Sequence, residues 1–346
     1  MPYCATKTRA EQTPMLGTNH PAHPESPGVR LIVNADDFGR TEAINAAVLQ
    51  AHSQGILTSA SLMIGEPAAS EAVRLARDHP ELAVGLHLVL LGGRSTLPPA
   101  EIPHLVDENG RFPRRPMRTG FRYFFSKKAQ VELGKEMRAQ FEAFGVTGLP
   151  LSHVDGHHHM QLHPAIFRLL LPLAHEFGAG AIRVSVSDEL FFSLRQDRRQ
   201  LLLKLGWKIA FSLLGLWGRR SLRRQTVPAA DRVYGLMQSG SVTESYLCRL
   251  FNRLADKTSE DNTAAPTRHR PVFEVFCHPS LNRESRRLGP NPGDLAALLS
   301  PVVRASAQAN NVLLTTYPEA WHSSLRRPPA AVAAQPEKQP TSTAKG

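Results

Sequence analysis

The stretch that decides the fold is LIVNADDFG at residues 31–39, where an apolar run ends in two aspartates, an aromatic residue and a glycine. Such a run predicts a buried strand over Leu31–Ala35, with Asp36 and Asp37 directly after it. The predicted strands are 31–35, 59–64, 82–88, 151–154, 181–186, 272–277 and 312–316, and the clearest predicted helices are 41–53, 68–78, 127–144, 164–177 and 293–309. Strands that alternate with helices form mostly parallel sheets with right-handed crossovers. Because no glycine-rich nucleotide-binding fingerprint follows any of these strands, we expect a closed β/α barrel rather than an open doubly wound sheet.

The composition is that of a folded protein. The chain has 346 residues, of which 42% are hydrophobic and 21% charged, unlike a disordered chain. Aperiodic, proline-punctuated sequence predicts disordered tails over 1–28 and 323–346, which leaves 29–322 as one barrel domain.

The three cysteines are far apart, which argues against a disulfide framework or a cysteine zinc site. The polar N-terminal stretch does not resemble a secretory signal, so we expect a cytoplasmic protein.

Positive charge is concentrated in one segment. The net charge is +11, and residues 195–224 hold nine basic residues beside a single acid, Asp197. The same segment contains the apolar stretch Ile209–Trp217, far shorter than the roughly 20 residues that cross a bilayer. It predicts either a basic amphipathic segment on an anionic membrane surface or an outer barrel helix whose apolar face is core.

The adjacent carboxylates of Asp36 and Asp37 would repel each other unless a cation or a shared proton lies between them. A divalent metal ion satisfies this requirement, and neighbouring side chains at a strand end point in different directions. One aspartate could then bind the metal while the other acts as a base. The alternative is that one of them caps the next helix, a role for which Thr41 competes.

Histidines follow several of the predicted strands. His87 closes the third strand, SHVDGHHH at 152–159 lies at the fourth, and His278 ends the sixth. In a parallel barrel these strand ends meet at one face, where enzymes of this architecture build their sites. Neutral imidazole is a common ligand of catalytic metals, although a single strand histidine can equally be a hydrogen-bonded core residue. Cys277, beside His278, is expected to point to the opposite face and to be buried and inert.

Together, these motifs resemble those of the YdjC-like (ChbG-type) carbohydrate deacetylases. The similarity runs from about residue 30 to residue 317, through NADDFG at 34–39, GLH at 85–87, SHVDGHHH at 152–159 and FEVFCHP at 273–279. It implies a seven-stranded (β/α) barrel of the glycoside hydrolase/deacetylase type that holds one divalent metal ion and acts on an N-acetylated amino sugar.

The resemblance also implies roles for individual residues. By their positions in the motifs, Asp37, His87 and His157 match the metal ligands, Asp36 the general base and His278 the general acid. Further candidates, for contacts behind the ligands or to the substrate, are Asp155, His159 and Arg183. A site of one carboxylate and two imidazoles accepts magnesium, zinc, iron, cobalt or manganese, and we favour magnesium or zinc.

A finer resemblance concerns the substrate. ADRVYGL at 230–236, followed by SG at 239–240 and TE at 243–244, is similar to the hopanoid-biosynthesis branch of the family, HpnK. This implies an N-acetylglucosaminyl hopanoid lipid as substrate, which the basic segment 195–224 would suit through contact with an anionic membrane from the cytoplasmic side.

The sequence is compatible with other functions. A deacetylase of soluble chitooligosaccharides, or another metal-dependent hydrolase, would use the same ion and base. A retaining glycosidase would need two carboxyls about 5–5.5 Å apart and would leave the histidines without a role. A non-enzymatic membrane-surface adaptor is supported only by the charge balance, and no interleaved aromatic and basic residues indicate nucleic-acid binding.

Overall fold

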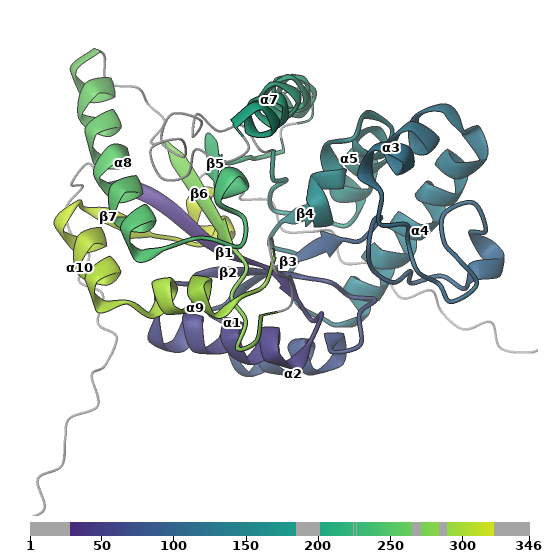
Figure 1. Ribbon diagram of the computed structural model, residues 1–346, viewed down its shortest axis with the longest axis horizontal. Coiled ribbons are helices and arrows are strands. Elements are labelled where there is room, and N and C mark those ends of the chain that lie inside the picture. Colours follow the sequence, from purple (N-terminus) through teal and green to yellow (C-terminus); the bar gives the residue numbers. More distant parts are fainter. Residues whose placement is uncertain are drawn as a thin grey trace, which may run out of the picture.

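Parallel strands form one curled sheet surrounded by helices in the computed structural model of the chain (Figure 1). The structure describes residues 28–184, 201–223, 225, 227–264, 271–283 and 289–321. The strands are β1 (Val29–Phe38), β2 (Ser59–Leu62), β3 (Ala83–Leu88), β4 (Val154–Gly156), β5 (Arg232–Tyr234), β6 (Val272–Cys277) and β7 (Val312–Leu314). The helices are α1 (Glu42–Gln54), α2 (Ala69–Asp78), α3 (Pro116–Phe125), α4 (Lys127–Val146), α5 (Pro164–Glu176), α7 (Leu201–Arg223), α8 (Glu244–Ala264), α9 (Pro292–Leu299), α10 (Pro301–Ala309) and α11 (Tyr317–Trp321), with short 3-10 turns η1 (Pro99–Glu101), η2 (His157–Leu162) and η3 (Leu236–Gln238).

The strand order is β4-β3-β2-β1-β6-β5, with β7 also paired to β1, and every pair is parallel. β1 is central because its apolar residues are buried on both faces, as in a strand covered by helices on one side and barrel core on the other. The segment around Ile182 connects the two edges of the sheet. Ile182 forms a parallel bridge with Val154 of β4, and its N–H donates to the carbonyl of Pro228, just before β5. The predicted α/β barrel class is confirmed.

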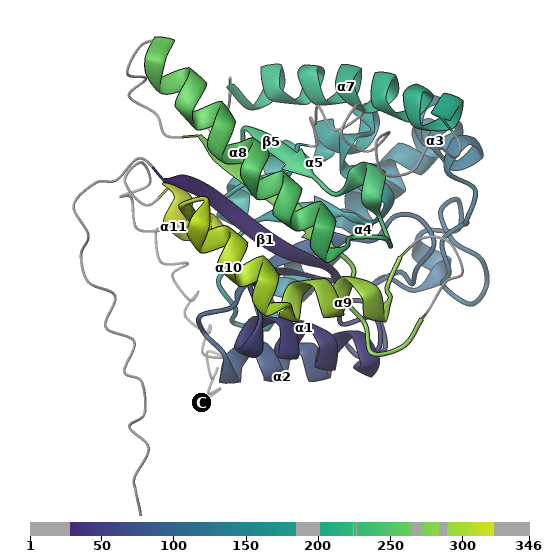
Figure 2. The same ribbon diagram turned by 60° about the vertical axis from the view of Figure 1, so that its left-hand side comes forward.

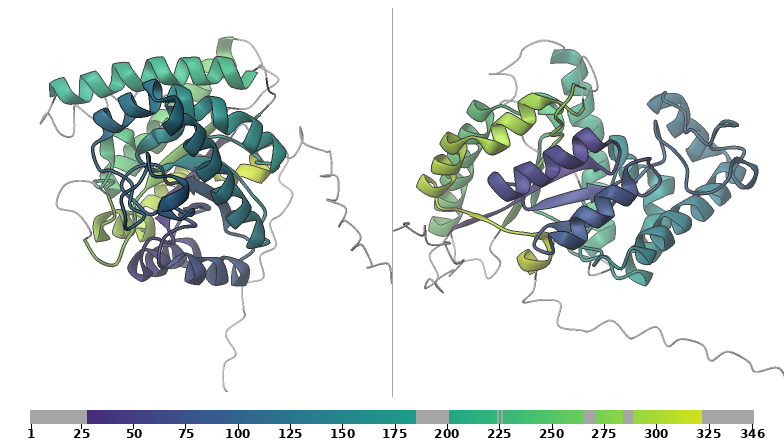
Figure 3. Two further views of the ribbon diagram at one scale, coloured as in Figure 1. Left: turned by 90° about the vertical axis from the view of Figure 1, so that its right-hand side faces the viewer. Right: turned by 90° about the horizontal axis from the view of Figure 1, so that it is seen from below.

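Helices cover the outside of the sheet, with α1 and α2 on one side, α8, α9 and α10 on a second and α5 and α7 on a third (Figures 2 and 3). α1 illustrates how the sequence builds this layer. Thr41 caps the helix by accepting the N–H of Ile44, and Ile44, Val48 and Ala51 form its buried stripe. The alternative that an aspartate of the doublet caps this helix is therefore wrong.

Some predicted element boundaries are wrong, for local physical reasons. β1 continues to Phe38, so the two aspartates lie inside its end rather than after it. The predicted helix 293–309 is two helices, because Pro301 cannot donate a backbone hydrogen bond and Ser300 caps the second one. In place of the predicted strand 181–186, residues 181–184 contain only the isolated bridge at Ile182, and residues 185–186 lie outside the described part. β5 was not predicted, since it has only three residues and begins with Arg232.

The predicted tails 1–28 and 323–346 lie outside the described residues, apart from Gly28, as do residues 195–200 and 224 of the basic segment. Among the helices that the structure describes, none combines the length and the apolar content needed to cross a bilayer.

Candidate active site

The end of β1 brings two neighbouring carboxylates to the same region. Ordinary strand alternation would send Asp36 and Asp37 to opposite faces. The pairing of β1 with β2 shifts register between Ala35 and Phe38, and Asp37 adopts a left-handed backbone with φ 66°. This conformation is costly for a residue other than glycine and is typical of functional sites. It re-aims the Asp37 side chain, so both carboxylates are buried at the carboxyl end of the sheet.

Asp37 lies within reach of two imidazoles from two other elements. Its Oδ1 atom is 3.0 Å from Nδ1 of His157, at the start of η2, and 3.5 Å from Nε2 of His87, in β3. The ligand atoms of these three residues all lie within 4.8 Å of one another. One carboxylate and two imidazoles at this spacing could hold a divalent metal ion. The three residues that the sequence predicted as ligands are thus brought together.

The second ring nitrogen of His87 is held by a carboxylate. Nδ1 of His87 is 2.7 Å from Oδ1 of Asp155, Oδ2 of Asp155 accepts a hydrogen bond from Ser61 at 2.9 Å, and the same oxygen forms an ion pair with Arg183 at 2.6 Å. A carboxylate behind a histidine fixes the tautomer and orientation of the ring and raises its basicity as a ligand. Asp155 therefore turns Nε2 of His87 toward Asp37.

Arg183 lies beneath the site and pairs with three carboxylates. Its guanidinium makes two hydrogen bonds of 2.9 Å to Asp36, one of 2.6 Å to Glu274 and the ion pair with Asp155, and its side chain is fully buried. Burial works to raise the pKa of Asp36, but Arg183 and nearby imidazoles hold it below its ordinary value. Asp36, His87 and Asp155 form a second group with ligand spacing. Because the guanidinium already neutralises both of its carboxylates, this second group is the poorer metal site.

His278 approaches Asp36 from the neighbouring strand. It follows β6, its backbone N–H donates to Oδ2 of Asp294 at 2.9 Å, and its Nε2 is 3.9 Å from Oδ2 of Asp36. Within the described part of the chain, Nδ1 of His278 has no hydrogen-bond partner, and the side chain keeps 12% of its exposure. Cys277 is fully buried, and burial raises the pKa of its thiol well above the ordinary value, which agrees with the expectation of an inert cysteine.

The electrostatics of the cluster favour positive charge between Asp37 and His87. Burial works to raise the pKa of Asp37, but His157 and His87 more than offset it and hold this pKa well below its usual range. Burial likewise works to lower the pKa of His87, whereas Asp155 and Asp37 raise it to about 10. The buried carboxylates thus stabilise positive charge at this place. A divalent ion bound between the residues, or a proton on the imidazole of His87, would supply that charge.

The remaining histidines of the cluster have different surroundings. His153 is fully buried, its ring stacks on Tyr317 at 3.9 Å, and burial lowers its pKa to about 3, so it is a neutral core residue. His159 has a left-handed backbone, its ring lies 5.1 Å from that of Phe276, and burial lowers its pKa to about 3. Arg183 is buried, and its guanidinium faces the carboxylates of Asp36, Asp155 and Glu274.

Sequence reasoning missed several polar residues of this site. Glu274 is buried between Arg183 and Tyr317, and burial raises its pKa to about 7 despite the neighbouring guanidinium. An acid inside the apolar run of β6 was a usable signal. Ser61 gave no signal in the sequence, since a serine in a strand of small residues is ordinary. Asp294 was also missed, because it accepts the backbone N–H of His278 from the first turn of a helix that is distant in the sequence.

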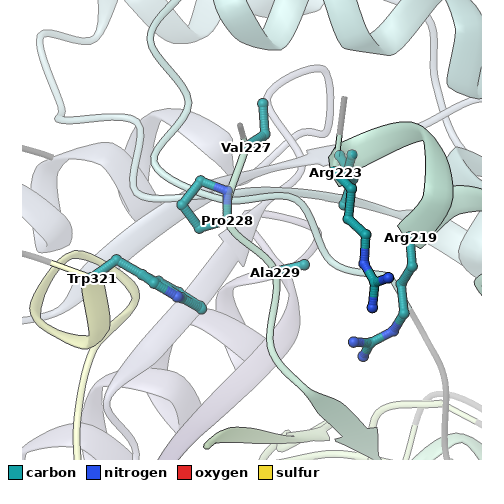
Figure 4. Close-up of a pocket in the computed structure, with 7 residues that line it drawn as sticks. Arg219, Arg223, Val227, Pro228, Ala229 and Trp321 are labelled. Atoms are coloured by element: carbon teal, nitrogen blue, oxygen red, sulfur yellow. The ribbon is translucent and has the colours of Figure 1, made fainter. Parts of the chain in front are cut away.

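A cavity of about 310 Å³ lies elsewhere, between the end of α7, the chain leading into β5 and Trp321 of α11 (Figure 4). Arg219 and Arg223 line it, and the guanidinium of Arg219 already donates to the carbonyls of Ala230 and Asp231. None of the carboxylates and imidazoles of the candidate site lines this cavity.

Comparisons with known proteins agree with this site. The sequence profile described as YdjC-like protein matches residues 30–309. A carbohydrate deacetylase of Geobacillus stearothermophilus is 33% identical over 293 residues, which cover 83% of this chain and 96% of that protein. A carbohydrate deacetylase of Brevibacillus brevis is 40% identical over 173 residues, 50% of this chain and 64% of that protein.

A solved structure has a similar fold. A protein of Enterococcus faecalis V583, to which cellobiose-phosphate cleavage has been ascribed, superposes with a TM-score of 0.64 at 24% identity. The superposition covers 84% of this chain and 98% of that one. At this identity the similarity supports the barrel architecture alone.

Proposed function

This chain belongs to the YdjC-like family, and we propose from that premise that it is a carbohydrate N-deacetylase, which hydrolyses the acetamide of an N-acetylated amino sugar with one divalent metal ion. The observation that carries the proposal is the convergence of Asp37, His87 and His157 from three elements, with Asp36 and His278 beside them.

The donor set fits a divalent ion. Asp37 offers a buried carboxylate oxygen, and His87 and His157 offer ring nitrogens on two sides of it. An ion bound there would supply Lewis-acid activation of water and of the acetamide carbonyl. The two imidazoles suit zinc and the carboxylate suits magnesium, so we propose one of these two, with iron, cobalt and manganese to be compared in the assay.

The neighbouring residues would handle the protons. An amide has a poor leaving group, so hydrolysis needs a base for the attacking water and an acid for the departing amine. We assign the base to Asp36, which Arg183 keeps ionised and oriented, and the acid to His278. The imidazole lies next to Asp36 without hydrogen bonding to it, at 3.9 Å, so its Nε2 is free to give a proton to the nitrogen of the departing amine.

For the natural substrate we propose an N-acetylglucosaminyl hopanoid. The similarity of residues 230–244 to the hopanoid-biosynthesis branch supports it, and so does helix α7. Ile209, Leu213 and Leu216 on α7 are more than half exposed, although Trp217 packs inward against Phe167 with ring centroids 5.2 Å apart. An exposed apolar stripe on a basic helix suits peripheral contact with an anionic membrane that carries such a lipid.

The test is acetate release. The full chain is incubated with an N-acetylglucosaminyl hopanoid or with a soluble chitooligosaccharide, in the presence of each divalent ion in turn. Mass spectrometry should detect a loss of about 42 Da from the substrate, the mass of an acetyl group exchanged for hydrogen. If only the soluble chitooligosaccharide loses this mass, the proposed deacetylase activity stands and the proposed lipid substrate is refuted. No loss from either substrate with any ion, or release of a sugar or phosphate instead, would refute the deacetylase.

A further inference from the structure

Helix α3 exposes a cluster of large apolar side chains, which we call the α3 patch. It consists of Met117, Phe121, Phe124 and Phe125, whose exposed fractions are 73%, 60%, 45% and 74%. The rings of Phe121 and Phe125 stack with centroids 6.4 Å apart, and those of Phe124 and Phe125 meet edge to face at 4.9 Å. The rings thus form one continuous surface, and contiguous exposed patches of this kind mark interaction sites.

Basic side chains surround the α3 patch. Those exposed around it are Arg114, Arg115, Arg118, Arg122, Lys127 and Lys128, and the sequence has no Asp or Glu between residues 109 and 131. Apolar rings in a basic stretch of sequence without acidic residues are typical of helices that lie in the interface of an anionic bilayer. A second copy of this chain is a poorer partner, because two patches of the same positive charge would repel each other.

Helix α3 packs against segments next to the candidate active site. The hydroxyl of Tyr123 donates to the carbonyl of Leu90, two residues after β3 ends, at 2.9 Å. A ring nitrogen of His163 is 3.1 Å from the carbonyl of Gly120, and His163 directly follows η2, the turn that begins with His157. Both contacts tie α3 to the segments that frame the metal-ligand cluster.

The second exposed apolar helix lies on the same side of the molecule. Helix α5 packs against both α3 and α7, and all three lie on one side of the sheet in Figure 1. Helix α5 therefore lies between the two helices that carry the exposed apolar side chains.

We infer that α3 docks onto the surface of an anionic lipid bilayer, with the α3 patch in the headgroup region and the surrounding basic side chains on lipid phosphates. In this orientation the rim of the candidate active site faces the bilayer, so a sugar carried on a lipid can reach the cluster from the membrane. The docking depends on the surface of α3 and holds whether or not the proposed deacetylase activity is correct, whereas a lipid-linked substrate would explain why the docking surface adjoins the site.

The test is sedimentation of the full chain with vesicles. One set contains phosphatidylcholine with about a third phosphatidylglycerol, and the other contains phosphatidylcholine alone. We expect binding to the anionic vesicles that weakens when salt is raised from about 0.1 M to 1 M, because the Debye length falls from about 10 to 3 Å. Equal binding to both vesicle types, or no binding to either, would overturn the inference.

Variants locate the contact. Phe121→Ser combined with Phe125→Ser should lower the partition onto anionic vesicles at least about tenfold, since both rings leave water on docking. The matched control is Val146→Ser with Val302→Ser, which removes exposed apolar side chains on other helices and should leave binding unchanged. A third variant, Ile209→Ser with Leu213→Ser, tests α7. Binding lost only in the α7 variant would overturn the role of α3.

Two further measurements separate the alternatives. A dimer in solution that the Phe121 and Phe125 double variant abolishes, without vesicle binding by the wild type, would assign the α3 patch to a second copy and overturn the inference. Deacetylation of a soluble chitooligosaccharide should be equal in the wild type and this double variant. If neither the wild type nor the double variant releases acetate, the proposed deacetylase function is refuted. The inference that α3 binds anionic vesicles is unaffected by that outcome.

Discussion

Replacing Arg183 by methionine should destabilise the protein more than any other single change to an arginine in the described part of the chain. Methionine roughly preserves the length of the aliphatic stem but removes the charge that pairs with Asp36, Asp155 and Glu274, all of them buried. Breaking one buried ion pair from one side costs about 3–5 kcal/mol, because the partner is left as an uncompensated buried charge. Asp155 keeps His87 as a second partner and Glu274 can take up a proton, so Asp36 is the carboxylate left uncompensated. We therefore expect a loss of unfolding free energy of about 3–5 kcal/mol.

The matched control is Arg138→Met. Arg138 also makes two hydrogen bonds of 2.7 Å to one carboxylate, that of Glu176, but both side chains are about half exposed. Exposed pairs contribute little because water and salt screen them. Urea unfolding followed by circular dichroism should therefore give a large shift for Arg183→Met and a negligible one for Arg138→Met. Equal shifts, or a shift for Arg183→Met of under about 1 kcal/mol, would refute the assignment of Arg183 as the buried counter-ion.

Glu274 adds a pH dependence to the same test. Burial raises its pKa to about 7 in the folded state, from 4.5. Between these values the folded protein keeps a proton that the unfolded chain has lost, so this residue lowers stability as pH rises through that window. Glu274→Gln removes the titrating group. The stability of the wild type relative to this variant should therefore fall between about pH 4.5 and pH 7, and a constant difference would contradict the raised pKa.

Other variants test the site and its packing. Asp36→Asn should keep its metal and lose turnover by about 10²–10⁴-fold, whereas His87→Ala should lose both metal and turnover. Metal content and acetate release are measured on the same samples. A fully active Asp36→Asn protein would refute the assignment of Asp36 as the base. Asp155→Asn should weaken zinc binding by about 10–100-fold in calorimetric titration, because His87 loses the partner that orients it; unchanged affinity would contradict that role. Gly85→Ala should cost about 1–3 kcal/mol in chemical unfolding, since its Cβ would lie 2.4 Å from the ring of His153. Gly145→Ala should be neutral or stabilising, because outside its own turn of helix no atom of the described residues lies within 4 Å of the added Cβ. Similar losses for both glycines would refute the packing argument.

The convergence of the ligands was predictable because it follows from topology. Asp37, His87 and His157 each lie at or just after the end of a different strand, and parallel strands place these ends at one face. The details at Asp37 were not predictable. Its left-handed backbone depends on the register shift between β1 and β2, which no local propensity of the sequence indicates.

The charge network behind the site could not be predicted for a different reason. Arg183 bonds to Asp36 across 147 positions of sequence and to Glu274 across 91. Such pairings depend on which side chains the closed sheet directs inward. From sequence, Arg183 was a candidate for contacts behind the ligands or to the substrate, and only the tertiary structure shows that it is buried behind the carboxylates.

The surface of α3 was missed because the sequence does not show which face of a short helix remains uncovered. Residues 116–125 were not predicted as a helix, and they begin with a proline and contain Gly120. Their aromatic residues would ordinarily indicate core. In the structure only Tyr123 turns inward, to Leu90, and the others face solvent.

The most direct test of the account is a crystal structure of the protein grown with zinc or manganese, with the ion located by its anomalous scattering. We expect one ion bound by Asp37, His87 and His157, with zinc to ligand distances of about 2.0–2.2 Å, and the pairing of Arg183 with Asp36 and Asp155 preserved. An ion held instead by Asp36, His87 and Asp155, or no ion at this end of the sheet, would contradict it.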